Sequence, residues 1–385
     1  ATEMLAKFDA YAYEWLGKMI YEKGWGEFFR SGPHREPFYP FMISLAMGIG
    51  DSLSISYHWI QKLFQVLFLL ASQILTLQLL RELRIRGSLQ CLTLLYVGFS
   101  PSIVGSSFSL FSEISSLPFV PARILAAVAS WKSIPGASLA KVMGWGVASG
   151  ALALLATMTR GIFQHVFYVS LIPFLFLLVS AWRAKTGKVA LNILAYLCAA
   201  LLIVQPGGVG YKLANKIHNG KYQLTDRYAN LLYGNASKRA RELTPRILLM
   251  HVASIPGYGV CRAFFSASEC EYCQPETIEG IQSRELGALL QGVPEERQNA
   301  RKIELAGERF LEKPLHYLLF MLIESARMFF WESTQLAFVQ YPAWLKSLFD
   351  FGPLRNGLRL VVSALTFAGV AYLASCVLGS LRERR

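Results

Sequence analysis

Charged side chains are scarce in this chain, and aspartate is the scarcest of them. Charged residues make up 16% of the 385 residues, where soluble domains have about a quarter, and hydrophobic residues make up 54%. This composition excludes disordered and collagen-like chains and favours a polytopic membrane protein. Only four aspartates occur, and none stands in an Asp-x-Asp pair, which argues against a metal-dependent enzyme that uses a soluble nucleotide sugar.

Several sequence signatures of catalysis are missing as well. The chain contains no Walker A motif, no complete G-x-G-x-x-G, no H-E-x-x-H and no G-x-S-x-G. ATP hydrolysis, dinucleotide binding, zinc proteolysis and serine hydrolysis therefore lack their usual markers. No nucleic-acid-binding motif occurs either, so the net charge of +13 does not indicate a nucleic-acid partner.

Long apolar runs dominate the rest of the sequence. A transmembrane helix needs about 20 mostly apolar residues. Seven runs are close to this length, at residues 58–80, 89–110, 114–131, 142–158, 162–182, 189–205 and 358–379. We therefore expect an all-α polytopic membrane protein.

The positive charges between these runs predict the orientation of the helices. Lys and Arg gather in alternate connections, namely at 81–86, 132–141, 183–188 and 382–385. By the positive-inside rule these connections are cytoplasmic, which puts residues 1–57 and 206–356 on the opposite side. Since the chain then starts outside, we expect a further helix upstream of Ala1.

The expected organisation has four parts. An extracytoplasmic first loop with amphipathic and re-entrant helices covers residues 1–57, because the apolar run that starts at Phe38 is too short to cross a bilayer. A six-helix transmembrane core covers 58–205. An extracytoplasmic loop domain with an interfacial helix covers 206–356. A last transmembrane helix and a basic cytoplasmic tail cover 357–385.

The run 314–339 is expected to be that interfacial helix. It is long enough to span, but Glu324, Arg327 and Glu332 lie inside it, and a charge at mid-bilayer costs about 3 kcal/mol. A helix that lies in the outer interface avoids this cost. Its expected headgroup anchors are Trp331, Tyr341 and Trp344.

The predicted outer loop carries an excess of positive charge and three cysteines. Between residues 206 and 250 the loop contains eight Lys and Arg residues, Lys212 among them, and only two acidic residues. Close to a bilayer this excess attracts lipid headgroups or a phosphorylated ligand, although a solvated surface explains it equally well.

The cysteines of this loop are Cys261, Cys270 and Cys273. An oxidising compartment permits a disulfide from Cys261 to either of the other two. A zinc site that adds His251 stays open as an alternative, but its spacing matches no standard zinc finger.

One motif stands where the first outer segment meets the membrane, at His34-Arg35-Glu36-Pro37-Phe38-Tyr39-Pro40. Its two prolines are expected to hold the backbone extended and to display the Arg, the Glu and the Tyr near the interface. The alternative is a purely structural role for these residues, as a proline-rich turn with an aromatic membrane anchor.

Arg123 is a cation inside the apolar run 114–131. An intramembrane arginine indicates a functional site, here for a lipid phosphate in a cavity where Pro118 and Pro121 break the helix. Snorkelling of the side chain toward the outer interface is the other explanation.

The motif Arg35-Glu36-Pro37-Phe38-Tyr39-Pro40 resembles the R-x-P-x-Y-P element that closes the first outer loop of GT-C membrane glycosyltransferases. This family includes protein O-mannosyltransferases and bacterial aminoarabinose transferases. Three other features fit the same pattern: Asp9 precedes the element, and Ser112-Glu113 and Thr159-Arg160 sit at the ends of later spans. The stretch 309–318 is similar to the family's outer helix.

The resemblance implies transfer of a sugar from a polyprenyl-phosphate carrier to an acceptor on the outer face, with membrane lipids around the site. It implies Asp9 as base or metal ligand, and we hypothesise that Glu36 and Glu113 are secondary acids that orient an acceptor or a metal. Ala10 stands where the family more often has a second acid, which leaves open whether a divalent cation is a cofactor. The candidates for binding the carrier's phosphate and the substrate are Arg35, Tyr39, Arg123, Arg160 and Lys212.

Two other classes of protein stay open. One is a noncatalytic membrane subunit of a larger assembly, which would bind a membrane-protein partner. Such a subunit would keep the GT-C-like fold and lose the catalytic acids. A transporter of a lipid-linked substrate would need intramembrane charge and broken helices, but no matching pair of interrupted segments is visible in two halves. The basic inward connections suit a bacterial inner membrane with periplasmic loops, although the endoplasmic reticulum has the same sidedness.

Overall fold

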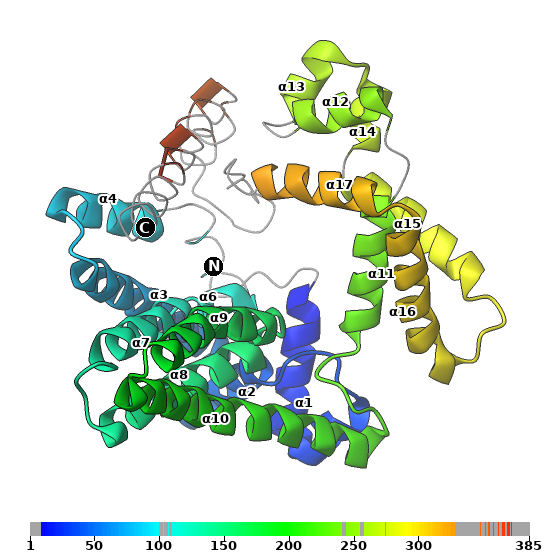
Figure 1. Ribbon diagram of the computed structural model, residues 1–385. Coiled ribbons are helices and arrows are strands. Elements are labelled where there is room, and N and C mark those ends of the chain that lie inside the picture. Colours follow the sequence, from blue (N-terminus) through cyan, green and yellow to red (C-terminus); the bar gives the residue numbers. More distant parts are fainter. Residues whose placement is uncertain are drawn as a thin grey trace. The chain divides into compact units, whose positions relative to one another are not determined.

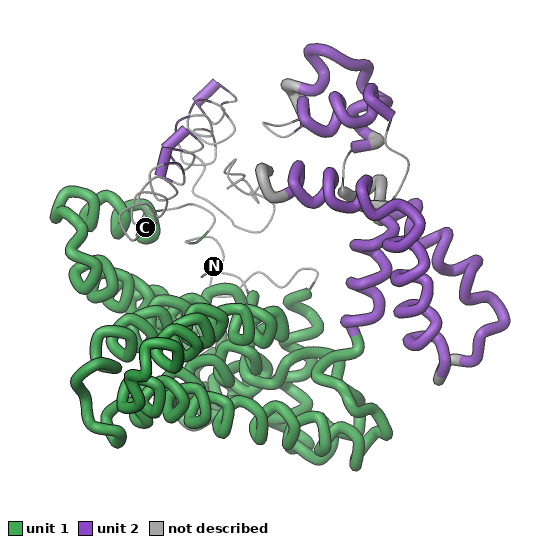
Figure 2. Tube along the Cα trace, viewed as in Figure 1, with its two compact units in different colours: residues 1–226, 335–340 green, residues 227–334, 341–385 purple. Residues whose placement is uncertain are grey.

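In the computed structural model, residues 9–99, 110–240, 244–254, 258–273 and 275–327 are described, together with isolated residues between and after these ranges. All regular elements in these ranges are helices (Figure 1). The chain forms two compact units, the first built from the described residues up to Asp226 and the second from those that start at Arg227 (Figure 2).

The first unit contains the helices that are apolar enough to cross a membrane. Its helices are α1 (Asp9–Ser31), α2 (Phe38–Leu53), α3 (Tyr57–Glu82), α4 (Gly87–Phe99), α6 (Ser112–Ser116), α7 (Phe119–Ser133), α8 (Leu139–Thr159), α9 (Ile162–Arg183) and α10 (Gly187–Asn219). In the described residues, five segments have the length and composition of a membrane span, namely α3, α6 with α7, α8, α9 and α10.

Five of the seven runs expected to span are thereby confirmed as long apolar helices. The run 89–110 is described only in part, since α4 ends at Phe99, and the run 358–379 lies outside the described ranges, as do the anchors Trp331, Tyr341 and Trp344. The protein is an all-α integral membrane protein by this criterion. The side of the membrane that each loop faces stays a prediction.

Helix α3 shows that the solvent around this unit is apolar. Its buried positions include Gln61, Gln65 and Ser72, whereas Leu63 and Leu67 are 52% and 50% exposed. This is the reverse of a water-soluble helix, which turns its apolar side inward. The arrangement is stable where hydrocarbon covers the outer surface, and the Gln65 amide N–H finds a partner inside in the Tyr39 hydroxyl.

The core of the first unit is the close pair α8 and α10. A side chain at Gly146 would place its Cβ 2.6 Å from the Tyr196 carbonyl oxygen, and one at Gly150 would place it 2.6 Å from that of Ala200. The two glycines are four residues apart and therefore share one face of α8. Small residues at this spacing let two helix backbones approach closely, which is a common way to pack helices in a membrane.

Helix α10 is longer than the sequence indicates. The run was expected to end at residue 205, with the outer loop beginning at Pro206, but the helix continues to Asn219 and ends before Gly220, whose φ is +78°. Tyr211 and Asn215 are buried on this extension. The packing of this extension against α1 keeps the helix intact past Pro206. The proline removes one backbone hydrogen bond but does not end the helix.

The second unit is a small helical domain. Its helices are α11 (Arg227–Ala240), α12 (Pro245–Ser254), α13 (Tyr258–Phe264), α14 (Ala267–Tyr272), α15 (Pro275–Leu289), α16 (Glu295–Glu312) and α17 (Pro314–Arg327). Its core is formed by Tyr233, Ala236, Leu305 and Ala306 from α11 and α16. Of the run 314–339, the structure describes α17, in which Glu324 pairs with Lys238 of α11 at 2.6 Å.

A disulfide joins Cys261 and Cys270, with their Cα atoms 5.9 Å apart. This is one of the two pairings that the sequence left open. Because the bond engages two of the three thiols, a zinc site made of all three cysteines with His251 does not form. Cys273 is buried in the same segment.

Candidate functional site

The proline motif begins a helix instead of extending the chain. Pro37 has φ −80° and ψ −22°, helical values, and α2 starts directly after it, so that Pro40 lies buried in the first turn. The expectation of an extended segment through both prolines is therefore wrong. Proline suits the first turn of a helix because its φ is fixed near the helical value and its missing N–H would have no partner there. The turn leaves Arg35 and Glu36 just before α2.

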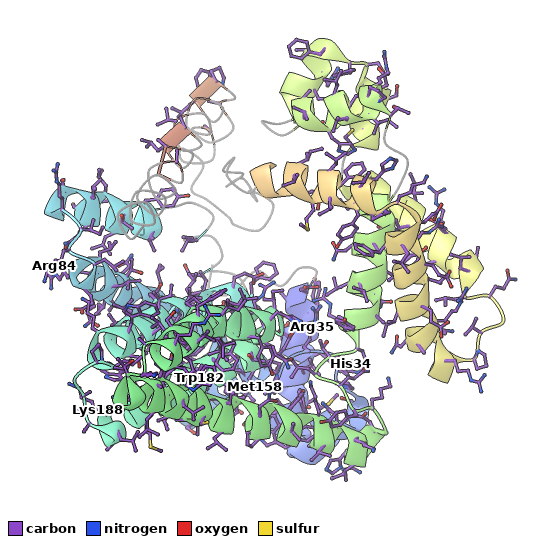
Figure 3. All side chains as sticks on the ribbon, in the orientation of Figure 1. His34, Arg35, Arg84, Met158, Trp182 and Lys188 are labelled. Atoms are coloured by element: carbon purple, nitrogen blue, oxygen red, sulfur yellow. A yellow bond between two sulfur atoms is a disulfide. The ribbon has the colours of Figure 1, made fainter. Side chains whose placement is uncertain are left out.

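Arg35 forms a two-pronged ion pair with Asp9 of α1. Its Nη2 lies 2.6 Å from Oδ1 of Asp9 and its Nη1 lies 3.2 Å from Oδ2. The Arg35 side chain is 8% exposed and that of Asp9 is 44% exposed. Figure 3 shows Arg35 beside α1. The carboxylate is thus held in a fixed orientation at the start of a helix, where negative charge is favoured, and one side of it stays accessible.

Tyr13 lies at the centre of the site, one helical turn after Asp9. Its hydroxyl shares a 3.0 Å hydrogen bond with Ser112, and its ring lies under the Arg35 guanidinium at 5.1 Å. The ring of Tyr39 packs edge-on against it at 5.1 Å. Burial, more than any other cause, raises the pKa of Tyr13 above its ordinary value. The hydroxyl therefore remains protonated at neutral pH.

A second ion pair and a third acid complete the cluster. Arg160, just after α8, pairs with Glu113 at the start of α6, and the Glu36 carboxylate accepts a 2.7 Å hydrogen bond from the Gly161 N–H. Burial disfavours the charged form of Arg160, but the Glu113 carboxylate outweighs it, so the pKa of Arg160 is raised. The Glu113 and Arg160 side chains are 50% and 40% exposed.

The cluster brings together acids and arginines that are far apart in the sequence. Three carboxylates and two guanidiniums meet around Tyr13 and Ser112, with one negative charge in excess. Both guanidiniums are already paired with carboxylates. A phosphate that binds at Arg160 would compete with Glu113 for the guanidinium, and displacement of Glu113 would release an acid at the same place.

Two other candidates lie elsewhere in the first unit. Arg123 of α7 hydrogen-bonds Ser170 and the Phe167 carbonyl of α9, away from the cluster around Tyr13. Lys212 lies on the extension of α10 beside Gln164 and Gln205, in a hollow of about 20 Å³. The structure does not bring these two cations together with the others.

The sequence analysis missed Tyr13 and Gln65. Tyr13 follows Asp9 by four residues, the spacing that puts two side chains on the same face of a helix, and this was the signal that could have found it. Gln65 is fully buried and donates a 2.8 Å hydrogen bond to the Tyr39 hydroxyl. A polar residue in the middle of an apolar run, as Gln65 is in 58–80, indicates an inward-facing position.

The donor set does not fit a metal centre. In the part of the chain that the structure describes, no three His, Cys, Asp or Glu side chains are grouped to hold a metal ion. Asp9, the expected ligand, is engaged by Arg35.

Comparison with known proteins adds no identification, because no protein-family model, curated protein or solved structure matches the chain. What the fold and the site define is an all-α integral membrane protein with a cluster of paired acids and arginines at the ends of its helices.

Proposed function

We propose that this protein is a membrane glycosyltransferase that moves a sugar from a polyprenyl-phosphate carrier to an acceptor on the extracytoplasmic face. One observation carries the proposal. Asp9, Arg35, Glu36, Glu113 and Arg160 come from four separate segments, and they converge on one cluster around Tyr13. The resemblance to GT-C glycosyltransferases singled out these five residues, together with Tyr39 and the stretch 309–318.

The chemistry assigns a role to each pair. The bond between the anomeric carbon and the phosphate oxygen breaks, and a bond from that carbon to an acceptor hydroxyl oxygen forms. The acceptor's proton passes to a carboxylate. Asp9 suits this role because Arg35 orients its carboxylate and its side chain is 44% exposed. The leaving polyprenyl phosphate gains negative charge, which Arg160 stabilises once Glu113 has given way.

The proposal extends to the location of the protein. A bacterial inner membrane with periplasmic loops would put the cluster on the side where lipid-linked sugars are consumed by such enzymes. The basic connections between the predicted spans support this orientation.

A noncatalytic membrane subunit is the second candidate, because a specific observation favours it. Every acid of the cluster is engaged by a group of the protein itself: Asp9 by Arg35, Glu113 by Arg160, and Glu36 by the Gly161 N–H. Such internal pairing is also what a structural clasp between helices would need.

Turnover of a labelled donor tests the two candidates against each other. Membranes that contain the protein are incubated with a panel of radiolabelled polyprenyl-phosphate sugars, and transfer to acceptors is counted. We expect transfer to fall at least a hundredfold in Asp9→Asn, a loss in the range of a general base. The matched control is Asp51→Asn, since Asp51 accepts a hydrogen bond from Tyr21 on α1 away from the cluster.

Full transfer by Asp9→Asn would remove Asp9 from the mechanism. Transfer that is equally absent from the wild type and from membranes without the protein, for every donor in the panel, would favour the noncatalytic candidate.

A further inference from the structure

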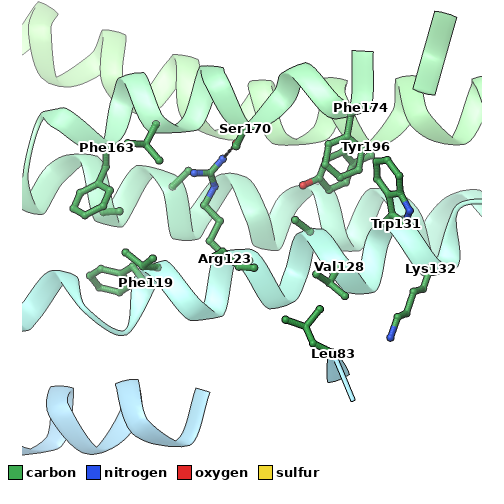
Figure 4. Close-up of a pocket in the computed structure, with 16 residues that line it drawn as sticks. Leu83, Phe119, Arg123, Val128, Trp131, Lys132, Phe163, Ser170, Phe174 and Tyr196 are labelled. Atoms are coloured by element: carbon green, nitrogen blue, oxygen red, sulfur yellow. Dashed lines mark hydrogen bonds between the residues drawn. The ribbon is translucent and has the colours of Figure 1, made fainter. Parts of the chain in front are cut away.

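A cavity of about 570 Å³ lies among helices α7, α8, α9 and α10 (Figure 4). Its inner wall includes the buried side chains of Ala153, Phe174 and Tyr196, which are 1%, 4% and 1% exposed. On its outer side Ile124 and Val166 are 45% and 46% exposed. The cavity therefore opens on the apolar surface of the membrane-spanning helices. Its size and apolar lining are typical of a site for a small hydrophobic ligand.

Arg123 is out of place in this lining. Its Nη2 donates hydrogen bonds to the Ser170 hydroxyl and, at 3.3 Å, to the Phe167 carbonyl, and its guanidinium lies 5.0 Å from the Phe167 ring centre. All of these partners are neutral. Among the described residues no carboxylate lies within ion-pair distance of Arg123, and both hydrogen bonds use one nitrogen. Nη1 and Nε therefore keep donors for a further partner.

Lys132 provides an internal comparison, because it lines the same cavity from the same helix. Its ammonium group lies 2.6 Å from a carboxylate oxygen of Glu82. Lys132 thus has its anion within the protein, whereas Arg123 has none among the residues that the structure describes. An unpaired charge in a low-dielectric site is costly, and buried charges in proteins are as a rule paired.

We propose that the cavity holds one hydrocarbon chain of an anionic bilayer phospholipid, and that the phosphate of this lipid accepts hydrogen bonds from Arg123. The apolar wall requires a hydrocarbon, and the uncompensated guanidinium requires an anion. A phospholipid supplies both in one molecule. Arginine binds phosphate well because its fork of N–H donors matches the phosphate oxygens.

A resident phospholipid fits better than the sugar carrier of the proposed function. A carrier would leave the cavity after each turnover, and Arg123 would then be unpaired for part of every cycle. Bilayer lipid is always present at the opening beside Ile124 and Val166. This inference does not rest on the proposed transferase activity, and either can fail alone.

Retention of lipid by the purified full-length protein tests the proposal. The protein is washed in mild detergent until bulk lipid is removed, and the lipids that remain are counted per chain by mass spectrometry. We expect the wild type to retain phospholipid and Arg123→Gln to retain about tenfold less, which is the effect of losing one charge-assisted contact. Lys132→Gln is the matched control and should retain lipid as the wild type does.

A second measurement covers the case in which Arg123→Gln fails to fold. Arg123→Lys keeps the charge, and delipidated Arg123→Lys and wild type should both gain thermal stability from added phosphatidylglycerol but not from an uncharged glycolipid. The proposal would be overturned if folded Arg123→Gln retained as much phospholipid as the wild type. So would the finding that the retained lipid is a polyprenyl phosphate, since the cavity would then belong to the donor.

Discussion

The candidate site contains a buried arginine and the cavity of α7 to α10 contains a half-buried one, and the two differ in how their charge is balanced. Arg35 has Asp9 as a two-pronged partner, whereas Arg123 is surrounded by neutral groups in the described part of the chain. Each arginine of the site has a carboxylate partner within the protein, whereas Arg123 has none among the described residues. At the site, the ion pair within the protein stabilises the fold. In the cavity, the charge of Arg123 depends on an anionic lipid from the membrane.

Removing the partner of Arg35 should have the largest effect. Asp9→Ala leaves a guanidinium that is 8% exposed without its anion, and we expect a loss of about 3 kcal/mol in the free energy of unfolding. Chemical unfolding followed by circular dichroism measures it. The double variant Asp9→Ala with Arg35→Met should recover part of the loss, because it removes the buried charge as well. A double variant as unstable as the sum of its two singles would show that the pair does not interact.

The wall of the cavity should be nearly as sensitive. In Gly146→Ala the new Cβ would lie 2.6 Å from the carbonyl oxygen of Tyr196, a residue of the cavity wall, and 2.8 Å from the Ala199 Cβ. We expect a loss of about 2 kcal/mol because the backbones of α8 and α10 must separate. Gly144→Ala is the control on the same helix, since nothing lies within 4 Å of its Cβ. Equal melting temperatures of the two variants would contradict the close approach.

Tyr13 should make the site sensitive to alkaline pH. Burial raises its pKa above the ordinary 10.0, so the folded protein holds the hydroxyl proton more tightly than the unfolded chain. That contribution is fully present below pH 10 and is lost as the pH rises from there through the pKa of the folded protein.

Tyr13→Phe tests this pH dependence. It removes the hydrogen bond to Ser112 and should cost about 1 kcal/mol at pH 7. It should also flatten the decline of stability as the pH rises above 10, measured by thermal unfolding. The same decline in both proteins would assign the effect to other groups.

The smallest effect on stability is expected at the exposed ion pair. The Glu113 and Arg160 side chains are about half exposed, and such pairs contribute about 0.5 kcal/mol. Glu113→Gln and Arg160→Gln should therefore unfold almost as the wild type does, yet Arg160→Gln should lose most of the transfer activity. A stable Arg160→Gln with full transfer would leave the pair without a catalytic role.

The apolar runs predicted most of the membrane part of the fold, because each span must satisfy its backbone within one helix and expose hydrocarbon side chains. The run that became α9 illustrates this with its 22 apolar-rich residues. Residues that sit where helices meet were harder to interpret. Pro206 and the glycines after it indicate a loop, but Tyr211 and Asn215 bury one face of α10 beyond them and keep the chain helical.

The sequence singled out the charged residues of the cluster, but it missed Tyr13 and did not indicate which residues pair. Asp9, Glu113 and Arg160 each lie at the end of a helix, where polar groups reach the interface. Which acid pairs with which arginine depends on how α1, α6 and α8 pack, and sequence spacing does not determine this. The neutral surroundings of Arg123 are likewise set by its neighbours on α9, Phe167 and Ser170.

The central claim is that the cluster around Tyr13 is a transferase site. A density map of the protein in lipid nanodiscs with a nonhydrolysable polyprenyl-phosphate sugar tests this most directly. We predict phosphate density within hydrogen-bond distance of Arg160, with Glu113 displaced and the sugar next to Asp9. An unchanged pair of Arg160 and Glu113, with the analogue bound elsewhere or a protein partner packed over the cluster, would contradict the account.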